Sequence, residues 1–229
     1  MPSIRRYLRH LWLSFTLLPG LASAHALEIH GSNTIGATLA PMLMTGFLQQ
    51  LTGNPVTARP TGTANETVLA TSYNGKPMTV LVAAHGTSTG FSALAADHAD
   101  IWAASRRVKG SEREAMATRA DLTSPASEHV IAIDGLAILV HPSNPVEQLN
   151  IDTLARVFAG EISNWSEVGG PDRPIRIYAR DEQSGTWDTF KELVLAGRYN
   201  LTPSAQRYES NDQLSNDVSN DPSGIGFAG

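Results

Sequence analysis

The sequence predicts an α/β protein built as two lobes. Its 229 residues contain several short apolar segments of strand length, and most lead into a glycine-rich or hydroxyl-rich turn and then into apolar residues at helical spacing. Strands that alternate with helices in this way are typical of a mainly parallel sheet. Such sheets bind ligands at the carboxyl ends of their strands. We therefore expect two α/β lobes, a hinge between them and a ligand cleft where they meet.

The first 24 residues have the organisation of a secretory signal peptide. Three arginines precede an apolar core over residues 11–21, and small residues occupy positions 22–24. Such a segment is removed during export, and its apolar core is too short to span a bilayer. We expect cleavage after Ala24 and a periplasmic mature protein.

Composition excludes several kinds of protein. The chain has no cysteine, which excludes disulfides, thiol catalysis, thiolate metal sites and a lipidated cysteine at the cleavage point. Its formal charge is −5, and loss of the three signal-peptide arginines makes it more negative. We expect no nucleic-acid partner, because an acidic chain lacks the positive surface that such partners require. The scattered histidines show no metal-ligand spacing, so we expect neither a metal nor another cofactor.

The first lobe is expected over residues 25–127. Three of its strands end in polar turns, at residues 31–35, 86–90 and 105–107, and apolar residues at helical spacing follow the first two. The start of a helix presents unpaired backbone N–H groups and therefore favours a bound anion. Since the carboxyl ends of parallel strands meet at one edge of a sheet, we expect these turns to lie close together.

The second lobe is expected over residues 128–215. The apolar runs at residues 129–133 and 136–140 are typical of buried strands. Residues 216–229 are expected to cross back to the first lobe, which would give the hinge its second connection. The chain ends in a strand-like apolar run, which we interpret as the mark of a fragment.

The segment at residues 180–186 is the strongest indication of a binding site. A strand leads into Arg180, and Ser184, Gly185 and Thr186 open an expected helix. The arginine fork matches tetrahedral oxygens, and the helix start and hydroxyls can donate further hydrogen bonds. A capping serine beside an ordinary surface arginine would have the same sequence. Four such turns, two of them with arginine, favour a shared site for one tetrahedral oxyanion.

Three motifs carry a family resemblance. Residues 134–145, 158–170 and 180–186 are similar to the phosphate-binding proteins of ABC phosphate transporters. The resemblance covers nearly all of the mature chain and is most specific from Glu128 to Phe190. It implies a type II periplasmic-binding fold, in which two α/β lobes close on a dehydrated phosphate.

The resemblance also implies which residues bind the anion. These are Thr34, Ile35, Thr87, Ser88, Ser105, Arg180, Ser184, Gly185 and Thr186. Arg106, which follows Ser105, is a further candidate because a second arginine favours anion binding. Glu182 stands where members of the family carry an acid that can pair with the arginine and hold its fork. We expect inorganic phosphate or a similar oxyanion as the ligand, an inner-membrane ABC permease as the partner, a monomeric state and no catalytic residue.

One departure from the family bears on selectivity. Many relatives place an aspartate at the position of Ser105 or Arg106, where it accepts the proton of hydrogen phosphate and repels fully ionised sulfate. This chain has Ser105, Arg106 and Arg107 in succession. A second arginine would strengthen anion binding in general, but without the acceptor we expect weaker discrimination against sulfate. Solvated surface charge is the alternative interpretation of at least one of the two arginines.

Two other functions stay open at this point. The run Gly86-Thr87-Ser88-Thr89-Gly90 satisfies the G-x-S-x-G pattern of the α/β-hydrolase nucleophile elbow, with Ser88 as the nucleophile. That fold places its histidine late in the chain, whereas the histidines after Ser88 are only His98, His129 and His141. Alternatively, the same lobes could serve as a phosphate sensor or envelope scaffold joined to a further C-terminal domain.

Overall fold

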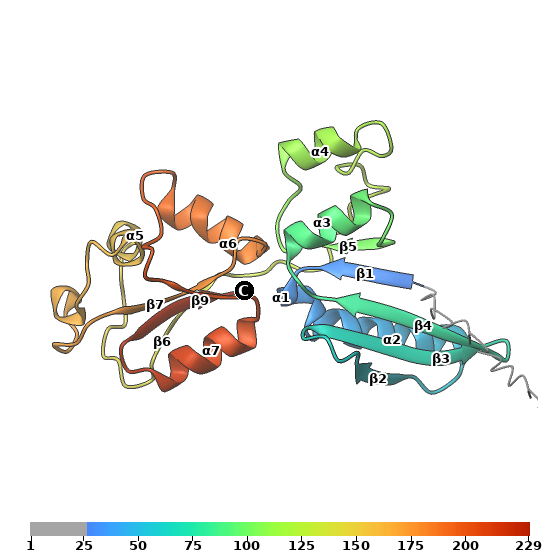
Figure 1. Cartoon of the computed structure of the whole chain (residues 1–229), viewed down its shortest axis with the longest axis horizontal. Helices are drawn as coiled ribbons and strands as arrows, with labels where there is room; N and C mark the ends of the chain where they lie inside the picture. The colour runs from blue at the N-terminus through green and yellow to red at the C-terminus, as the bar shows by residue number, and fades with distance from the viewer. Residues whose placement is uncertain (1–26) are drawn as a thin grey trace, which may run out of the picture.

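The computed structural model describes residues 27–229, so the expected signal peptide at residues 1–24 lies outside the described residues. Two α/β lobes lie side by side (Figure 1). Within the described residues each lobe has its own sheet, of five strands in the first and four in the second. The predicted α/β class and two-lobed organisation are confirmed. Over this same range no helix combines the length and the apolar character needed to cross a membrane.

The first sheet has the strand order β2-β3-β4-β1-β5. Its strands are β1 (Leu27–Gly31), β2 (Thr57–Pro60), β3 (Glu66–Tyr73), β4 (Lys76–Ala83) and β5 (Ile101–Ala103). β1 runs parallel to β4 and β5, whereas β3 is antiparallel to both of its neighbours. The sheet is therefore mixed, because the β3-β4 hairpin turns tightly through Asn74 and Gly75, which both have positive φ.

The first lobe has four helices within the described residues. They are α1 (Asn33–Gly36), α2 (Leu39–Thr52), α3 (Thr87–Ala95) and α4 (Gly110–Met116). The core beneath them includes Ile29, Leu48 and Leu69. The helical spacing after residue 38 correctly predicts α2, but its most apolar face points away from the sheet, and Met42 and Phe47 are exposed.

The second sheet has the order β6-β9-β7-β8. Its strands are β6 (Ala137–Val140), β7 (Arg176–Arg180), β8 (Gln206–Tyr208) and β9 (Gly224–Ala228). β7 is parallel to β8 and β9, and β6 is antiparallel to β9. Residues 216–229 do not cross back to the first lobe as expected. Instead β9 fills the gap between β6 and β7, where Ile225 and Phe227 are fully buried.

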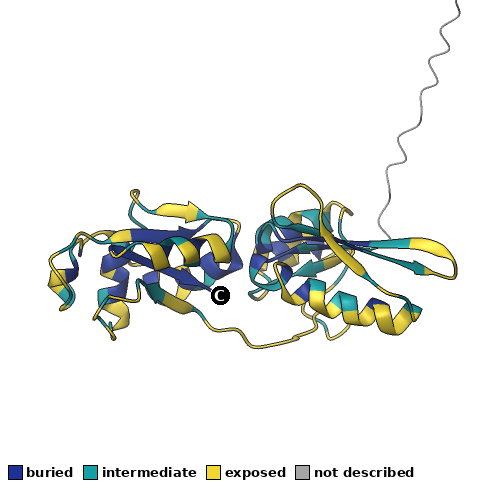
Figure 2. Ribbon diagram, turned by 90° about the horizontal axis from the view of Figure 1, so that it is seen from below, coloured by how far each residue is buried: buried dark blue, intermediate teal, exposed yellow. Residues whose placement is uncertain are grey.

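The link between the lobes differs from the prediction at residues 129–133. This apolar run forms no strand, and Val130, Ile131 and Ile133 are exposed, Ile133 to 98%. Figure 2 shows an exposed connection that passes between the lobes. Strand propensity alone does not create a strand where no neighbouring backbone pairs with it.

The core of the second lobe is aromatic and holds its helices against the sheet. These are α5 (Ile151–Ala159), α6 (Gly185–Phe190), α7 (Asn211–Asn220), the 3₁₀ turn η1 (Trp165–Val168) and the π-helical turn η2 (Lys191–Leu195). Phe190 stacks on Phe227 with ring centroids 4.0 Å apart. Trp165 is fully buried and donates from its ring nitrogen to the Ser223 carbonyl at 3.1 Å. This core fixes the position of α6, which carries part of the site described below.

Phe190→Ala should destabilise the second lobe by about 3–5 kcal/mol, because it removes a fully buried ring from this stack. Leu193→Ala is the matched control, since Leu193 is 60% exposed in the adjacent helical turn and its loss should change stability by less than about 0.5 kcal/mol. Denaturant unfolding followed by tryptophan fluorescence measures both. Equal effects of the two substitutions would contradict the assigned core.

Candidate functional site

The polar turns of the two lobes meet at the junction between them. Thr34 of α1 and Thr186 of α6 place their hydroxyl oxygens 3.2 Å apart, although 152 residues separate them in the chain. On the α3 side, the Ser88 backbone N–H donates to the Gln183 carbonyl at 3.1 Å. The structure thus brings together the helix starts that the sequence predicts to form one site.

The α1 turn depends on a close backbone approach. Gly31 ends β1 with φ +149°, and a Cβ atom there would lie 1.9 Å from the Ala103 carbonyl oxygen. Only glycine fits at such a position. The next residues, Ser32 and Asn33, are buried, and Thr34 faces the second lobe. Ile35 packs against the first-lobe core, so only its backbone is available to a ligand.

The α3 turn and the end of β5 form a second hydroxyl pair. Thr87 is fully buried, and its hydroxyl oxygen accepts from the Ser105 backbone N–H at 3.3 Å. The two side-chain oxygens lie 3.2 Å apart. A Cβ added to Gly185 of the opposite lobe would come within 2.4 Å of the Thr87 hydroxyl and 2.6 Å of the Ser105 hydroxyl. The lobes can approach this closely because position 185 has no side chain.

The α6 turn is held by its own cap. Ser184 is buried and its hydroxyl accepts from the Trp187 backbone N–H at 3.3 Å. Capping satisfies one of the N–H groups that a helix start leaves unpaired. The capping and anion-binding interpretations of this serine are therefore compatible.

Arg180 is the most unusual group of the junction, because it is a cation with 1% exposure. Its guanidinium donates to the carbonyls of Tyr208 and Glu209 and to the Asn211 side-chain oxygen. Among the described residues it makes no ion pair with a carboxylate within 4.0 Å. Burial lowers the pKa of Arg180 to about 10, against the opposing charges of Asp181 and Glu209, so the group still carries its charge at neutral pH.

Glu182 does not hold the Arg180 fork as expected. Its side chain is 77% exposed and pairs instead with Arg207, at 3.5 Å. The role expected of it falls to neutral acceptors in residues 208–211. Within the part of the chain that the structure describes, the buried charge of Arg180 therefore has no neutralising carboxylate in direct contact.

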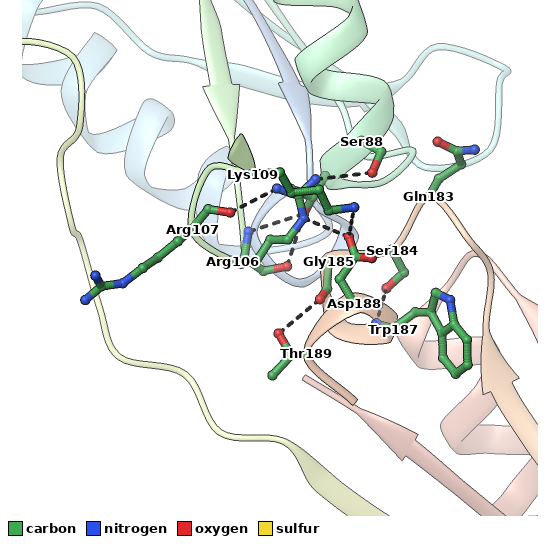
Figure 3. A network of polar contacts seen from close by, with 12 residues as sticks. Ser88, Arg106, Arg107, Lys109, Gln183, Ser184, Gly185, Trp187, Asp188 and Thr189 are labelled. Carbon is green, nitrogen blue, oxygen red and sulfur yellow. Dashed lines mark hydrogen bonds and ion pairs between the residues drawn. The ribbon is translucent and has the colours of Figure 1, made fainter. Parts of the chain in front are cut away.

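Arg106 is neither a solvated surface charge nor a free donor (Figure 3). Its Nε donates to Asp188 at 2.8 Å, and its two terminal nitrogens donate to both oxygens of Glu112, at 2.8 and 2.6 Å. The remaining N–H groups donate to the Arg107 carbonyl and the Ser88 hydroxyl. All five guanidinium donors thus have acceptors.

The Arg106 network also joins the lobes. Asp188 belongs to α6 in the second lobe, and Lys109 of the first lobe contacts the same carboxylate at 2.6 Å. The side chains of Arg106 and Asp188 are 7% and 11% exposed. In contrast, Arg107 is exposed, and its side chain points away from the network in Figure 3. The surface-charge interpretation therefore fits Arg107 alone.

The hydrolase alternative finds no support in the geometry of Ser88. The strand-turn-helix context of the G-x-S-x-G pattern is present, but the Ser88 hydroxyl accepts from Arg106. Within the described residues no histidine hydrogen-bonds to it, and a serine nucleophile needs such a base. Of the histidines named above, His141 contacts Ser143 instead.

Sequence reasoning missed several polar residues of the junction. Asn211 donates from its backbone to Asn33 at 3.0 Å and from its side chain to Thr34 at 3.1 Å. His85 contacts Glu209 across the lobes at 2.7 Å. For Asp188 the sequence contained only a weak indication, namely an acid in the first turn of a predicted helix, where it complements the helix dipole. No sequence signal pointed to Asn211 or His85, since their partners in the facing lobe lie more than a hundred residues away in the chain.

Comparison with known proteins places the fold in a family. The family model described as PBP superfamily domain matches residues 49–228. The protein SphX of Synechococcus elongatus is 35% identical over 163 residues, which cover 67% of this chain and 46% of that protein. The phosphate-binding protein PstS of Borreliella burgdorferi is 31% identical over 118 residues, or 49% of this chain and 42% of that protein. These alignments span less than half of either relative.

Solved structures agree with the fold. A substrate-binding protein of a phosphate ABC transporter from Clostridium perfringens, with bound phosphate, superposes with a TM-score of 0.64 at 22% identity and covers 88% of this chain and 69% of that one. An ABC-type phosphate transport receptor from Vibrio cholerae gives a TM-score of 0.57 at 26% identity, with coverage of 88% and 70%. The type II periplasmic-binding fold expected from the sequence is confirmed.

Glu112→Gln should destabilise the first lobe by about 3–5 kcal/mol at neutral pH, because it leaves the buried Arg106 without its bidentate partner. Burial raises the pKa of Glu112, but the hydrogen bonds from Arg106 and Lys109 outweigh it and hold the pKa below 4.5. The stabilisation is therefore present at neutral pH and is lost as the pH falls through the lowered value. Denaturant unfolding at neutral and acidic pH measures the difference in unfolding free energy between the parent protein and the Glu112→Gln variant.

Glu114→Gln is the control for this substitution, because Glu114 is exposed on the same helix. It should leave the unfolding free energy unchanged at either pH. If Glu112→Gln is as stable as the parent protein at neutral pH, Arg106 is not held in the way described here.

Proposed function

Because the chain belongs to the PBP superfamily, we propose that it captures inorganic phosphate, or a similar tetrahedral oxyanion, between its lobes for an ABC importer. The observation that carries the proposal is the charge of Arg180, which is buried without a carboxylate partner among residues 27–229. A buried charge is costly unless it is paired. A bound anion would supply the missing partner. The names of the relatives, which include phosphate-binding proteins from several bacteria, support phosphate as that anion.

The proposed ligand residues come from both lobes. From the first lobe, Thr34 and Ile35 offer the start of α1, Thr87 and Ser88 the start of α3, and Ser105 the end of β5. From the second lobe, Arg180 offers its guanidinium and Ser184, Gly185 and Thr186 the start of α6. Backbone N–H groups at helix starts and a planar arginine fork together provide donors around a tetrahedral anion.

In this mechanism no bond is made or broken. The lobes close over the anion and exclude water, which strengthens each hydrogen bond in a less polar surrounding. Arg106 is also among the proposed ligand residues, but its donors already have acceptors. Its principal contribution in this proposal is to bridge the lobes through Asp188 and to add positive potential beside the site.

The cellular setting of the proposal follows from the same family. We infer export to the periplasm, release of the anion to an inner-membrane ABC permease and a monomeric protein. The apparent signal peptide and the names of the transporter relatives support this setting.

Arg180→Ala should weaken phosphate binding by at least about 1.5–3 kcal/mol, the range for hydrogen bonds to charged groups. Arg176→Ala is the control, because Arg176 begins the same strand but its side chain is 63% exposed. Isothermal calorimetry with inorganic phosphate measures both variants. Phosphate binding by Arg180→Ala that equals that of the Arg176→Ala control is incompatible with the site.

Sulfate should compete with phosphate more effectively here than in relatives that carry an aspartate beside Ser105. The Arg106 guanidinium only donates hydrogen bonds, so it cannot accept one from the P–OH group of hydrogen phosphate as an aspartate would. Competition titrations with sulfate and arsenate from acidic to alkaline pH test this expectation. Strong rejection of sulfate at every pH would show that another acceptor performs the selection.

A further inference from the structure

A histidine that sequence analysis left without a role bridges the two lobes. His85 follows β4 in the first lobe. Its Nδ1 lies 2.7 Å from a carboxylate oxygen of Glu209 in the second lobe, and its Nε2 lies 3.1 Å from a carboxylate oxygen of Glu66 on β3. The histidine and both acids are partly exposed, with side-chain exposures of 31%, 39% and 22%. The bridge lies beside the proposed ligand residues but includes none of them.

The geometry of this bridge requires a protonated ring. Ionised carboxylates only accept hydrogen bonds, and a neutral imidazole has one donor. Two contacts of this kind therefore need a proton on each ring nitrogen. Partial burial lowers the pKa of His85, but the hydrogen bonds to Glu66 and Glu209 outweigh it and raise the pKa above 6.5.

Other charged groups face the bridge through its two acids. Burial alone would raise the pKa of Glu66. The contacts with His85 and Thr61 and the charge of His30 on β1 outweigh burial, so the net effect lowers this pKa below 4.5. Glu209 lies near Arg180 and Asp181, which follow one another at the end of β7. Of the three side chains that form the bridge itself, His85 is the one whose charge changes near neutral pH.

Glu209 belongs to a short segment, residues 208–211, that holds Arg180. The carbonyls of Tyr208 and Glu209 and the side chain of Asn211 accept from the Arg180 guanidinium. The same segment also contacts the first lobe, where Asn211 donates to Asn33 and Thr34. The 208–211 segment therefore contacts both the proposed anion-binding arginine and the facing lobe.

We propose that His85 is a positioning residue, which in its protonated form fastens the 208–211 segment to the first lobe and so holds Arg180 in place when the lobes are closed. This inference rests on the proposed function, because Arg180 is taken to bind the anion. The protonated His85 contact is expected to raise the affinity for phosphate at mildly acidic pH above the affinity that the ligand residues alone would provide.

The direction of the pH effect follows from the raised pKa. A group that gains a proton more readily in the closed arrangement stabilises that arrangement below its free pKa of about 6.5. The stabilisation is lost as the pH rises through the raised value. The contact between His85 and Glu209 therefore weakens as the pH rises through the raised pKa of His85.

Calorimetric titration with inorganic phosphate, from mildly acidic to alkaline pH, tests the proposal in His85→Gln and in the parent protein. The ratio of their dissociation constants at each pH cancels the ionisation of phosphate itself. We expect binding by the variant to be up to about fivefold weaker at mildly acidic pH, the upper range for partly exposed ion pairs. The two proteins should bind equally at alkaline pH. His98→Gln is the control, because His98 is exposed at the end of α3, and it should match the parent throughout.

Glu209→Ala provides a second variant, since it removes the carboxylate but keeps the backbone carbonyl that accepts from Arg180. It should show the same pH-dependent loss, and thermal melting shows whether either variant is unfolded. A loss that is equal at all pH values in both variants, or no loss in either, overturns the role of His85. If the parent protein binds no phosphate at any pH, the proposed function fails instead.

Discussion

The burial of the Arg180 guanidinium is the constraint on which the site depends. A cation with 1% exposure needs acceptors in every direction, and the described chain surrounds it with neutral oxygens but no carboxylate in direct contact. Such an arrangement is costly unless an anion completes it. The protein thus keeps a positive charge in a poorly solvated place, where an oxyanion gains more from it than at the surface.

The rest of the fold supplies the rigid surroundings that this charge requires. The aromatic stack of Phe190 and Phe227 fixes α6 against β9, and β7 delivers Arg180 at its carboxyl end. Two sets of contacts then join the lobes on either side of the site. Arg106 reaches Asp188 on one side, and the 208–211 segment reaches His85 and α1 on the other. Some groups, such as Thr34 and Arg106, therefore serve both in joining the lobes and in the proposed site, whereas Asp188 and His85 only join the lobes.

Sequence patterns within a few residues predicted the local structure correctly. They did not predict the contacts between segments that are distant in the chain. Strand-turn-helix patterns gave α1, α3 and α6 at their correct places, because turn chemistry and helical spacing are encoded within a few residues. The exposed run at residues 129–133 and the insertion of β9 between β6 and β7 depend on which strands find partners. For the same reason Glu182 could not be distinguished from Asn211 as a neighbour of Arg180. Nor could the sequence reveal that Arg106 has two carboxylate partners.

The most direct test of the account is a crystal structure grown with inorganic phosphate. It should show one phosphate between the lobes, with an oxygen hydrogen-bonded to the Arg180 guanidinium and others near the starts of α1, α3 and α6. The anion would then provide the negative charge that no carboxylate of residues 27–229 supplies to Arg180. Phosphate bound elsewhere, with Arg180 still surrounded only by Tyr208, Glu209 and Asn211, would contradict the central claim.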